Sequence, residues 1–226
     1  RPDDIFICTP PKSGTTWTQA ICALLIFGRA DLAVKPAHIS PWIDANFIPL
    51  EEVVAMLEAQ SHRRFIKTHA PLDGIPFIPG HVHLTVYRDP RDVFLSWRRH
   101  AGNMKMRAPD PRLAMDVNEA FQDWCLEPLA PGVAGGVTLE SVIHHYRTFK
   151  AFGHLEDIHF LHYADMKRDL IRAMDRIAGI LGIEAPPPLI EAMAATASFD
   201  NMKRKADQFA PNAGRLEWRS AEGFFA

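Results

Sequence analysis

Residues 5–17 read IFICTPPKSGTTW, and this stretch decides the fold. The apolar run at 4–9 is followed by turn residues and predicts a short buried strand. Pro, Ser and Gly at 10–15 predict a tight loop. From 16 to 27, apolar side chains recur at helical spacing, at Trp17, Ala20, Ile21, Leu24 and Leu25. The stretch therefore predicts a strand, a loop and a helix in direct succession.

Outward from this unit, strand patterns and helix patterns alternate along the chain. Further strands are predicted at 64–67, 83–87 and 157–162. Further helices are predicted at 50–60, 90–100, 118–126, 139–152, 170–181 and 189–196. Prolines at 186–188 interrupt the chain before the last of these helices, and the polar residues from Asp200 onward predict an irregular tail.

Strands that are separated by helices predict a parallel sheet covered on both faces. We therefore expect an α/β fold: a single domain over residues 1–226, with a central parallel sheet flanked by helices and a P-loop-like phosphate-binding unit at its start. In such sheets ligands bind at the carboxyl ends of the strands, in the loops that lead into helices. The loops at 10–17, 67–71 and 88–96 are expected at these strand ends, and all three contain basic and hydroxyl residues.

The composition sets limits on function. The chain has 226 residues, 47% hydrophobic and 23% charged, which suits one sizeable core. A net charge of -2 argues against a general nucleic-acid binder but allows a local basic pocket. Cys8, Cys22 and Cys125 lie far apart in apolar stretches, which predicts reduced thiols rather than disulfides.

Targeting and metal-binding patterns are also missing from the sequence. It has no membrane-length apolar run, no signal-peptide pattern and no metal-ligand spacing such as H-E-x-x-H. We expect a cytoplasmic protein with no metal, no membrane segment and no nucleic-acid partner. Because the chain begins at Arg1 rather than Met, we also expect that a few residues precede it.

The loop PKSGTTW at 11–17 has the chemistry to hold an anion, because a helix N-terminus offers free backbone N–H groups and the positive end of its dipole. Gly14 lets the backbone approach closely, Lys12 adds a charge, and Trp17 offers a flat face to a base. Hydroxyl donors come from Ser13, Thr15 and Thr16. The loop is not a Walker A motif, because the lysine precedes Gly14. The alternative is a plain helix N-cap.

The stretch YRDPRDVFLSW at 87–97 is a second candidate phosphate site. Arg88 follows a predicted strand, and Ser96 lies about two helical turns further on. A strand-end arginine can bind a phosphate through two parallel hydrogen bonds, to which a helical serine adds a hydroxyl. The alternative is a surface arginine beside Asp89, which would cap the helix.

The stretch FIKTHAP at 65–71 supplies a candidate general base. A histidine with a pKa of about 6.5 can accept a proton near neutral pH. A hydroxyl becomes a good nucleophile only when a base begins to remove its proton, which makes His69 a candidate base beside Lys67. The alternative is a loop histidine that bonds to the backbone.

Together these three motifs resemble those of the cytosolic sulfotransferase family, and in particular of bacterial members that act on small molecules. The stretch 11–17 is similar to the 5′-phosphosulfate loop of that family, 88–96 to its R-x-x-R/K-D-x-x-x-S motif, and 67–71 to its K-T-H-x-P motif. One departure is Pro10, where the family often has Tyr. The resemblance implies 3′-phosphoadenosine 5′-phosphosulfate as the sulfuryl donor.

For donor binding, the resemblance implies that residues 13–16 hold the 5′-phosphate, that Trp17 packs against the adenine, and that Arg88 and Ser96 bind the 3′-phosphate. YADMK at 163–167 is similar to the Y-E-D-M-K segment of the family. SFDNM at 198–202 resembles its S-F-x-x-M segment near the adenine. These two weaker matches add Tyr163, Ser198, Phe199 and Met202 to the candidate donor site.

For catalysis, the resemblance implies in-line transfer of the sulfuryl group to a small-molecule alcohol, phenol or amine, with His69 as general base. Lys12 would contact the bridging oxygen, and Lys67 would assist. Charge builds on that oxygen as it leaves, so preformed cations lower the barrier and no metal is required. We expect the walls of the acceptor pocket to come from 42–47, 72–77 and 103–123.

Some family features are not found. The C-terminal loop R-K-G-x-x-G-x-W has no match, since GRLEW at 214–218 is no substitute, and we expect that the sequence stops short of this loop or omits it. The dimer motif of the family is not seen either, so the oligomeric state stays open. Two other classes also remain: an ATP-dependent small-molecule kinase, which would want a Walker A loop, and a non-catalytic nucleotide-binding module, in which His69 would be dispensable.

Overall fold

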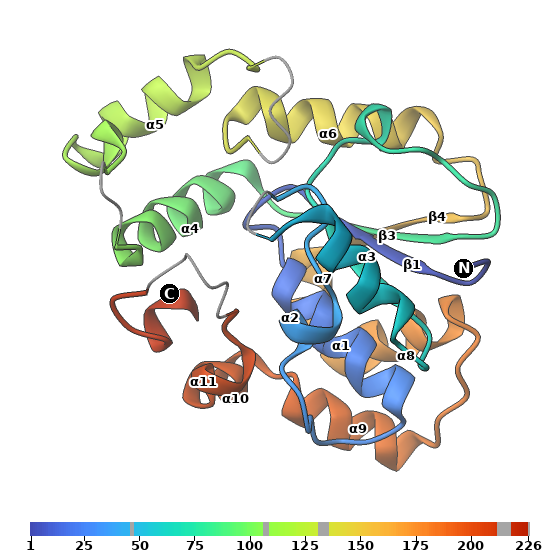
Figure 1. The fold of residues 1–226 in the computed structure, drawn as a ribbon. Helices are drawn as coiled ribbons and strands as arrows, with labels where there is room; N and C mark the ends of the chain where they lie inside the picture. The colour runs from blue at the N-terminus through green and yellow to red at the C-terminus, as the bar shows by residue number, and fades with distance from the viewer. Residues whose placement is uncertain (46–47, 106–108, 131–135, 212–217, 226) are drawn as a thin grey trace.

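The computed structural model describes residues 1–45, 48–105, 109–130, 136–211 and 218–225. At its centre lies a four-stranded parallel sheet in the order β2–β1–β3–β4 (Figure 1). The strands are β1 (Ile5–Cys8), β2 (Phe65–Thr68), β3 (Val82–Tyr87) and β4 (Ile158–His162). The prediction of an α/β fold with a central parallel sheet is confirmed.

Helices cover both faces of the sheet because successive side chains of β1 point in opposite directions. Ile5 and Ile7 face a large apolar core, whereas Phe6 and Cys8 join a smaller cluster that contains Phe149. Figure 1 shows the corresponding helices on opposite sides of the strands. The first side carries α1 (Thr15–Phe27), α8 (Leu170–Ile180) and α9 (Pro187–Thr196). The second carries α4 (Pro90–Asn103), α5 (Val117–Leu126) and α6 (Leu139–Ala151).

A third apolar cluster joins α4 and α5 to α6, with Phe94 and Trp124 buried at its centre. It is separate from the two clusters on the sheet faces, and it holds α4 against its neighbours. Outside the layers, α3 (Leu50–Glu58) matches the predicted helix at 50–60. Two short 3₁₀ helices complete this half of the chain, η1 (Leu72–Gly74) and η2 (Pro111–Leu113).

The short helices were the main error of the sequence prediction. The tail after Asp200 was expected to be irregular, but it lies partly in α10 (Phe199–Arg204) and α11 (Ala206–Phe209). Both α2 (Pro36–Ile39) and α7 (Tyr163–Arg168) were missed. Helix α9 begins inside the proline run, because proline is tolerated in the first turn, where its missing N–H would have no partner.

All three cysteines are free thiols, as predicted. Cys8 and Cys22 are buried, and burial raises the pKa of Cys22 to about 12. Within the described ranges, no helix combines the length and the apolar character that a bilayer-spanning segment requires.

A buried ion pair fixes the amino ends of two neighbouring strands. Asp4 precedes β1 and is 3% exposed, and Arg64 precedes β2. Arg64 donates to both carboxylate oxygens, with its Nε 2.7 Å from Oδ1. Burial by itself raises the pKa of Asp4, but the hydrogen bonds from Arg64 outweigh it and hold that pKa below its ordinary value. The backbone N–H of Ile5 bonds to the Arg64 carbonyl at 3.0 Å, so the pair and the sheet reinforce each other.

We expect Asp4→Asn to lower the free energy of unfolding at pH 7 by about 2–4 kcal/mol, because it leaves a half-buried arginine without its countercharge. The stabilisation by a carboxyl with a depressed pKa is present above the unfolded value near 3.8 and is lost as pH falls through the folded value. The difference in the free energy of unfolding between parent and variant, measured by urea unfolding, should therefore be smaller at pH 3 than at pH 7. The matched control is Asp31→Asn, which breaks an exposed pair with Arg29 and should cost under about 0.5 kcal/mol. Equal losses in the two variants would contradict the assignment.

Candidate active site

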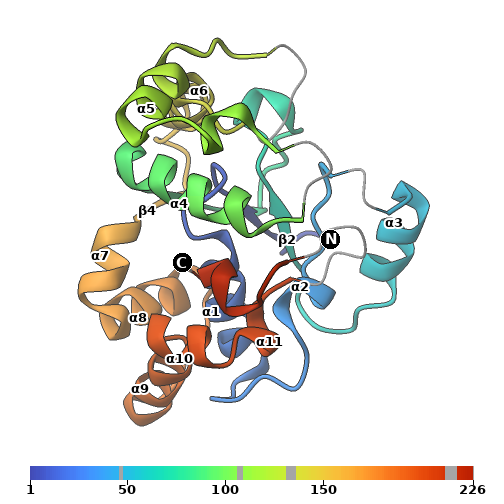
Figure 2. The ribbon, with the colours of Figure 1, turned by 90° about the vertical axis from the view of Figure 1, so that its left-hand side faces the viewer.

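A cavity of about 950 Å³ opens where the carboxyl ends of β1, β2 and β3 meet the loops that follow them. Figure 2 shows α4, α7, α10 and the 3₁₀ helix η3 (Glu222–Phe225) grouped around the amino end of α1. The predicted site residues that line the cavity are Lys12, Gly14, Thr15, Thr16, Trp17, Lys67, His69, Arg88, Ser96, Tyr163, Phe199 and Met202. The structure thus brings together side chains from separate parts of the sequence. Ser13 and Ser198 lie outside this lining.

The loop between β1 and α1 is built on two residues in left-handed backbone conformations. Lys12 has a φ of 66°, and Gly14, the N-cap of α1, has a φ of 109°. A turn of this kind directs backbone N–H groups toward one point and makes an anion-binding concavity. Ser13 is fully buried, and its hydroxyl has no hydrogen-bond partner among the described residues. Behind the loop, the hydroxyls of Thr9 and Thr15 are 2.5 Å apart.

Trp17 and Tyr163 form an aromatic corner beside this loop. The Trp17 indole N–H donates to the carbonyl of Ala197 at 2.7 Å, which fixes the ring. The Tyr163 ring meets the Trp17 ring edge-on at a centroid distance of 5.3 Å. Sequence reasoning placed Tyr163 at a strand end, and the structure shows it as the first residue of α7, directly after β4. The corner gives the cavity two aromatic rings set at an angle of 66° to each other.

Three of the cationic side chains that line the cavity come from the predicted motifs: Lys12, Lys67 and Arg88. The Arg88 guanidinium donates to the carbonyl of Lys12 at 3.2 Å and lies 4.3 Å above the Tyr163 ring. Its Nε is 3.9 Å from a carboxylate oxygen of Asp92. These contacts hold Arg88 at the end of β3, where a phosphate can meet it.

Burial lowers the pKa values of both lysines, and neighbouring cations add to the shift of Lys12. Burial, followed by the charges of Lys67 and Arg88, lowers the pKa of Lys12 to about 7. Burial lowers the pKa of Lys67 to about 8, and the nearby Asp44 carboxylate opposes that shift. Crowded buried cations are unfavourable by themselves, so the arrangement suits a ligand with several negative charges.

His69 is held in one tautomer. Its Nδ1 lies 2.7 Å from the carbonyl oxygen of Thr9, and because a carbonyl only accepts, Nδ1 carries the proton. The neutral ring therefore has its lone pair on Nε2. Burial lowers the pKa of His69 well below its ordinary value, with further contributions from Lys67, His145 and Lys12. The site at neutral pH thus holds a neutral imidazole beside two lysines.

The serines of the prediction differ in their surroundings. Ser96 is 9% exposed and lines the cavity from α4. The Ser198 hydroxyl instead caps α10: it accepts from the N–H of Asn201 at 3.3 Å and donates to the carbonyl of Ala195 at 2.9 Å. Sequence pattern alone did not distinguish a serine that lines the cavity from a serine that caps a helix.

Sequence reasoning missed the aromatic residues near the C-terminus. Trp218, Phe224 and Phe225 line the cavity, and the Lys12 ammonium lies 5.3 Å from the centre of the Phe224 ring. His100 of α4 packs against both Trp218 and Phe224. The two adjacent phenylalanines at 224–225 were the one feature of the sequence that could have pointed to these residues. Of the stretch 214–218, residues 214–217 lie outside the described residues.

The expected acceptor walls are only partly found at the cavity. Trp42, Met104 and Asp110 line it, whereas residues 46–47 and 106–108 lie outside the described ranges. Leu72 and Phe77 instead line a separate apolar hollow of about 600 Å³ against α6. Within the described ranges, no three His, Cys, Asp or Glu side chains are grouped so that they could share a metal ion.

Gly14→Ala tests the loop geometry. A methyl group there would lie 3.1 Å from the Tyr163 ring, and a φ of +109° strains any L-residue. We expect a loss of about 1–3 kcal/mol in the free energy of unfolding, together with weaker binding of inorganic pyrophosphate. Gly179→Ala is the control: Gly179 lies inside α8, and nothing would lie within 4 Å of its added methyl. That change should be neutral or stabilising by about 0.5–1 kcal/mol. A Gly14 variant as stable as the parent would contradict this account of the loop.

Comparisons with known proteins agree with this geometry. The sulfotransferase domain family matches residues 2–225. A glycolipid sulfotransferase of Mycobacterium bovis is 38% identical over 252 residues, covering 100% of this chain and 77% of that protein. A cytosolic sulfotransferase of Arabidopsis thaliana is 27% identical over 219 residues, covering 90% of this chain and 60% of that protein. A mouse sulfotransferase solved with PAP superposes with a TM-score of 0.71 at 19% identity, covering 100% of this chain and 75% of that chain.

The family model matches nearly the whole chain. The Mycobacterium bovis relative is 38% identical to it over its full length. The fold is shared with a solved sulfotransferase. This chain, with its phosphate-type loop, basic cavity and neutral histidine, is therefore a member of the sulfotransferase family.

Proposed function

We propose that this sulfotransferase takes its sulfuryl group from 3′-phosphoadenosine 5′-phosphosulfate and transfers it to a hydroxyl or amine of an apolar small molecule, with His69 as general base. The observation that carries the proposal is the meeting of Lys12, Lys67 and Arg88 with a neutral His69 around one cavity. The mouse relative of the same fold was solved with PAP, the desulfated form of this donor, which supports the choice.

The cavity fits such a donor in size and charge. Its volume of about 950 Å³ lies in the range of small-molecule sites, roughly 300–1,000 Å³. The loop at 13–16 would bind the 5′-phosphosulfate, and Arg88 with Ser96 would bind the 3′-phosphate. Trp17 and Tyr163 offer faces to the adenine, with Phe199 and Met202 nearby in the lining.

The reaction breaks the bond between sulfur and the bridging phosphate oxygen and forms a bond between sulfur and the acceptor oxygen. His69 accepts the hydroxyl proton at Nε2 as the acceptor oxygen attacks. The electron pair of the broken bond stays on the bridging oxygen, whose negative charge Lys12 and Lys67 stabilise. The products are a sulfate ester, PAP and a protonated His69, which returns its proton to solvent.

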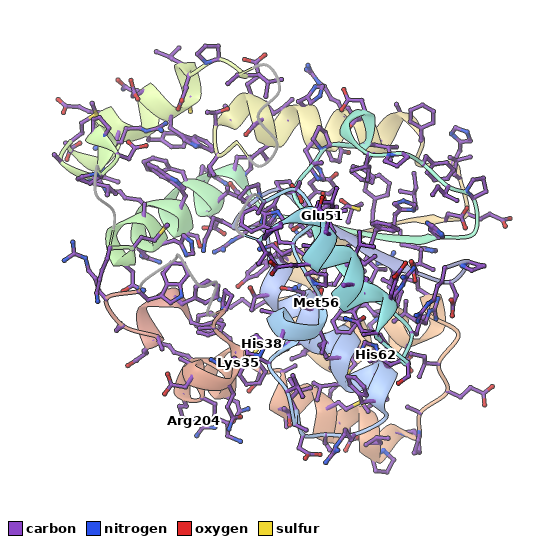
Figure 3. The ribbon with its side chains drawn as sticks, in the orientation of Figure 1. Lys35, His38, Glu51, Met56, His62 and Arg204 are labelled. Atoms are coloured by element: carbon purple, nitrogen blue, oxygen red, sulfur yellow. The ribbon has the colours of Figure 1, made fainter. Side chains whose placement is uncertain are left out.

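The acceptor side of the cavity is mostly apolar. Trp42 and Met104 line it, as does Met56 of α3, which Figure 3 labels. Such walls favour an alcohol, phenol or amine carried on an apolar body. The mycobacterial relative is named for glycolipids, which join hydroxyls to an apolar part in the same way.

Calorimetric titration with PAP, with ATP and AMP as controls and no added metal, tests the donor proposal. We expect PAP to bind more tightly than AMP by at least about tenfold, since only PAP carries the 3′-phosphate that meets Arg88. Binding a polyanion raises the pKa values of Lys12 and Lys67 from about 7 and 8, so the protein should take up protons at pH 8. Titrations in buffers of different ionisation enthalpy measure that uptake. A preference for ATP or a need for Mg²⁺ would contradict the proposal.

His69→Ala tests the base. We expect kcat to fall by about 10²–10⁴-fold, since general-base catalysis contributes that much, while the Kd for PAP stays within about threefold. His38→Ala is the matched control, a histidine in the lining of the same cavity with no bond to the phosphate loop, and it should keep most of kcat. A His69→Ala enzyme with near-parental kcat would remove His69 from the mechanism and favour another base.

A further inference from the structure

The segment at 40–44 runs alongside β2 like a fifth strand and meets it at Lys67. Trp42 forms a parallel bridge with Lys67, whose N–H donates to the carbonyl of Pro41 at 3.0 Å. The N–H of Ile43 in turn donates to the carbonyl of Lys67 at 3.1 Å. The backbone on both sides of the lysine is therefore tied to this segment.

The same segment is anchored to the helix of the phosphate loop. Gln19 of α1 donates to both the carbonyl and the hydroxyl of Ser40, at 3.0 and 2.9 Å. Gln19 is 2% exposed and Ser40 is 1% exposed, so this contact is shielded from water. The segment thus joins α1 to the end of β2 and has a fixed position relative to both.

Trp42 contacts two candidate functional side chains, one near the end of β2 and one directly after it. The Lys67 ammonium lies 3.9 Å from the centre of the Trp42 ring, a short cation–π distance. The Trp42 and His69 rings meet nearly at right angles, with centroids 4.8 Å apart and an interplanar angle of 79°. The indole therefore packs against both the ammonium and the imidazole.

Asp44 acts on the same two residues. Its Oδ2 accepts the backbone N–H of His69 at 3.0 Å, while the His69 ring is held through Nδ1 by Thr9. Its other oxygen is buried with no hydrogen-bond partner among the described residues, so its charge is poorly screened by solvent. That charge favours the protonated form of Lys67.

We infer that Trp42 and Asp44 are positioning residues of the reaction: Trp42 fixes the Lys67 ammonium and the His69 ring, and Asp44 fixes the His69 backbone and balances the Lys67 charge. The inference rests on the proposed function for the roles of Lys67 and His69. Neither residue needs to touch the donor for this role. Both act through Lys67, whose proposed partner is the donor, and through His69, whose proposed partner is the acceptor hydroxyl.

The first experiment measures the Lys67 ammonium directly, by NMR titration of isotopically labelled lysines in the protein without ligand, with Lys67→Met to assign the signal. The Asp44 carboxylate acts on the pKa of Lys67, and the Lys67 charge in turn acts on the titratable groups of Lys12, His69 and His100. We expect Trp42→Leu and Asp44→Asn each to lower the pKa of Lys67 from about 8 by about half a unit or more, because each removes a contact that favours the charged form. Trp42→Phe, which keeps an aromatic face, should restore most of the value. If the pKa of Lys67 is unchanged in both variants, the inference is overturned, even if the donor proposal holds.

The second experiment separates positioning from folding and from donor binding. Trp42→Leu should lower kcat by about tenfold with the Kd for PAP within about threefold, and Trp42→Phe should recover most of kcat. In Asp44→Asn, the alkaline limb of kcat/KM for the donor should move to lower pH, since Lys67 loses its proton earlier. The control is Asp73→Asn, because Asp73 lies in η1 and pairs with His144. This change should leave the alkaline limb of kcat/KM at its parental pH. Parental kcat in Trp42→Leu together with an unmoved limb in Asp44→Asn would overturn the inference, whereas failure of the parent to bind PAP would bear on the donor proposal alone.

Discussion

The parallel pairing of β1 with β2 on one side and with β3 on the other controls the geometry of the cavity. Parallel strands end at the same edge, so the loops that follow Cys8, Thr68 and Tyr87 start side by side. An antiparallel partner at either position would carry its loop to the opposite edge. His69 and the cations can meet only because this pairing puts them there, and the apolar clusters on the two faces keep the strands in register.

The cavity is electrostatically unfavourable when it holds only its own side chains. Lys12, Lys67 and Arg88 repel one another, and burial adds to the cost of their charges. The structure offsets this through aromatic faces, with Phe224 near Lys12, Trp42 near Lys67 and Tyr163 under Arg88. An aromatic face attracts a cation without neutralising it, so the charge stays available to an anionic ligand. A carboxylate at each of these places would bind the cation more strongly and would compete with the ligand.

Sequence patterns predicted the sheet and most of the candidate site because both depend on local signals. The run at 5–8 is apolar throughout, and the loop before Thr15 contains the residues that a helix N-terminus needs. The short helices α2, α7, α10 and α11 were missed because four to six residues carry too little periodicity and are held by tertiary contacts. The place of Phe224 over Lys12 could not be predicted either, since no local pattern relates residues so far apart in the chain.

The hydrogen bond from His69 to the Thr9 carbonyl has a consequence for regioselectivity. With Nδ1 occupied, the imidazole offers its lone pair in one direction only. With His69 in its proposed role as base, an acceptor with several hydroxyls of similar acidity would be modified at the one that reaches Nε2 while its apolar body fills the space beside Trp42. The carbonyl at the end of a central strand would in this way decide which oxygen of the acceptor receives the sulfuryl group, and exchange of apolar wall residues would change the position of the product sulfate without any change in the chemistry.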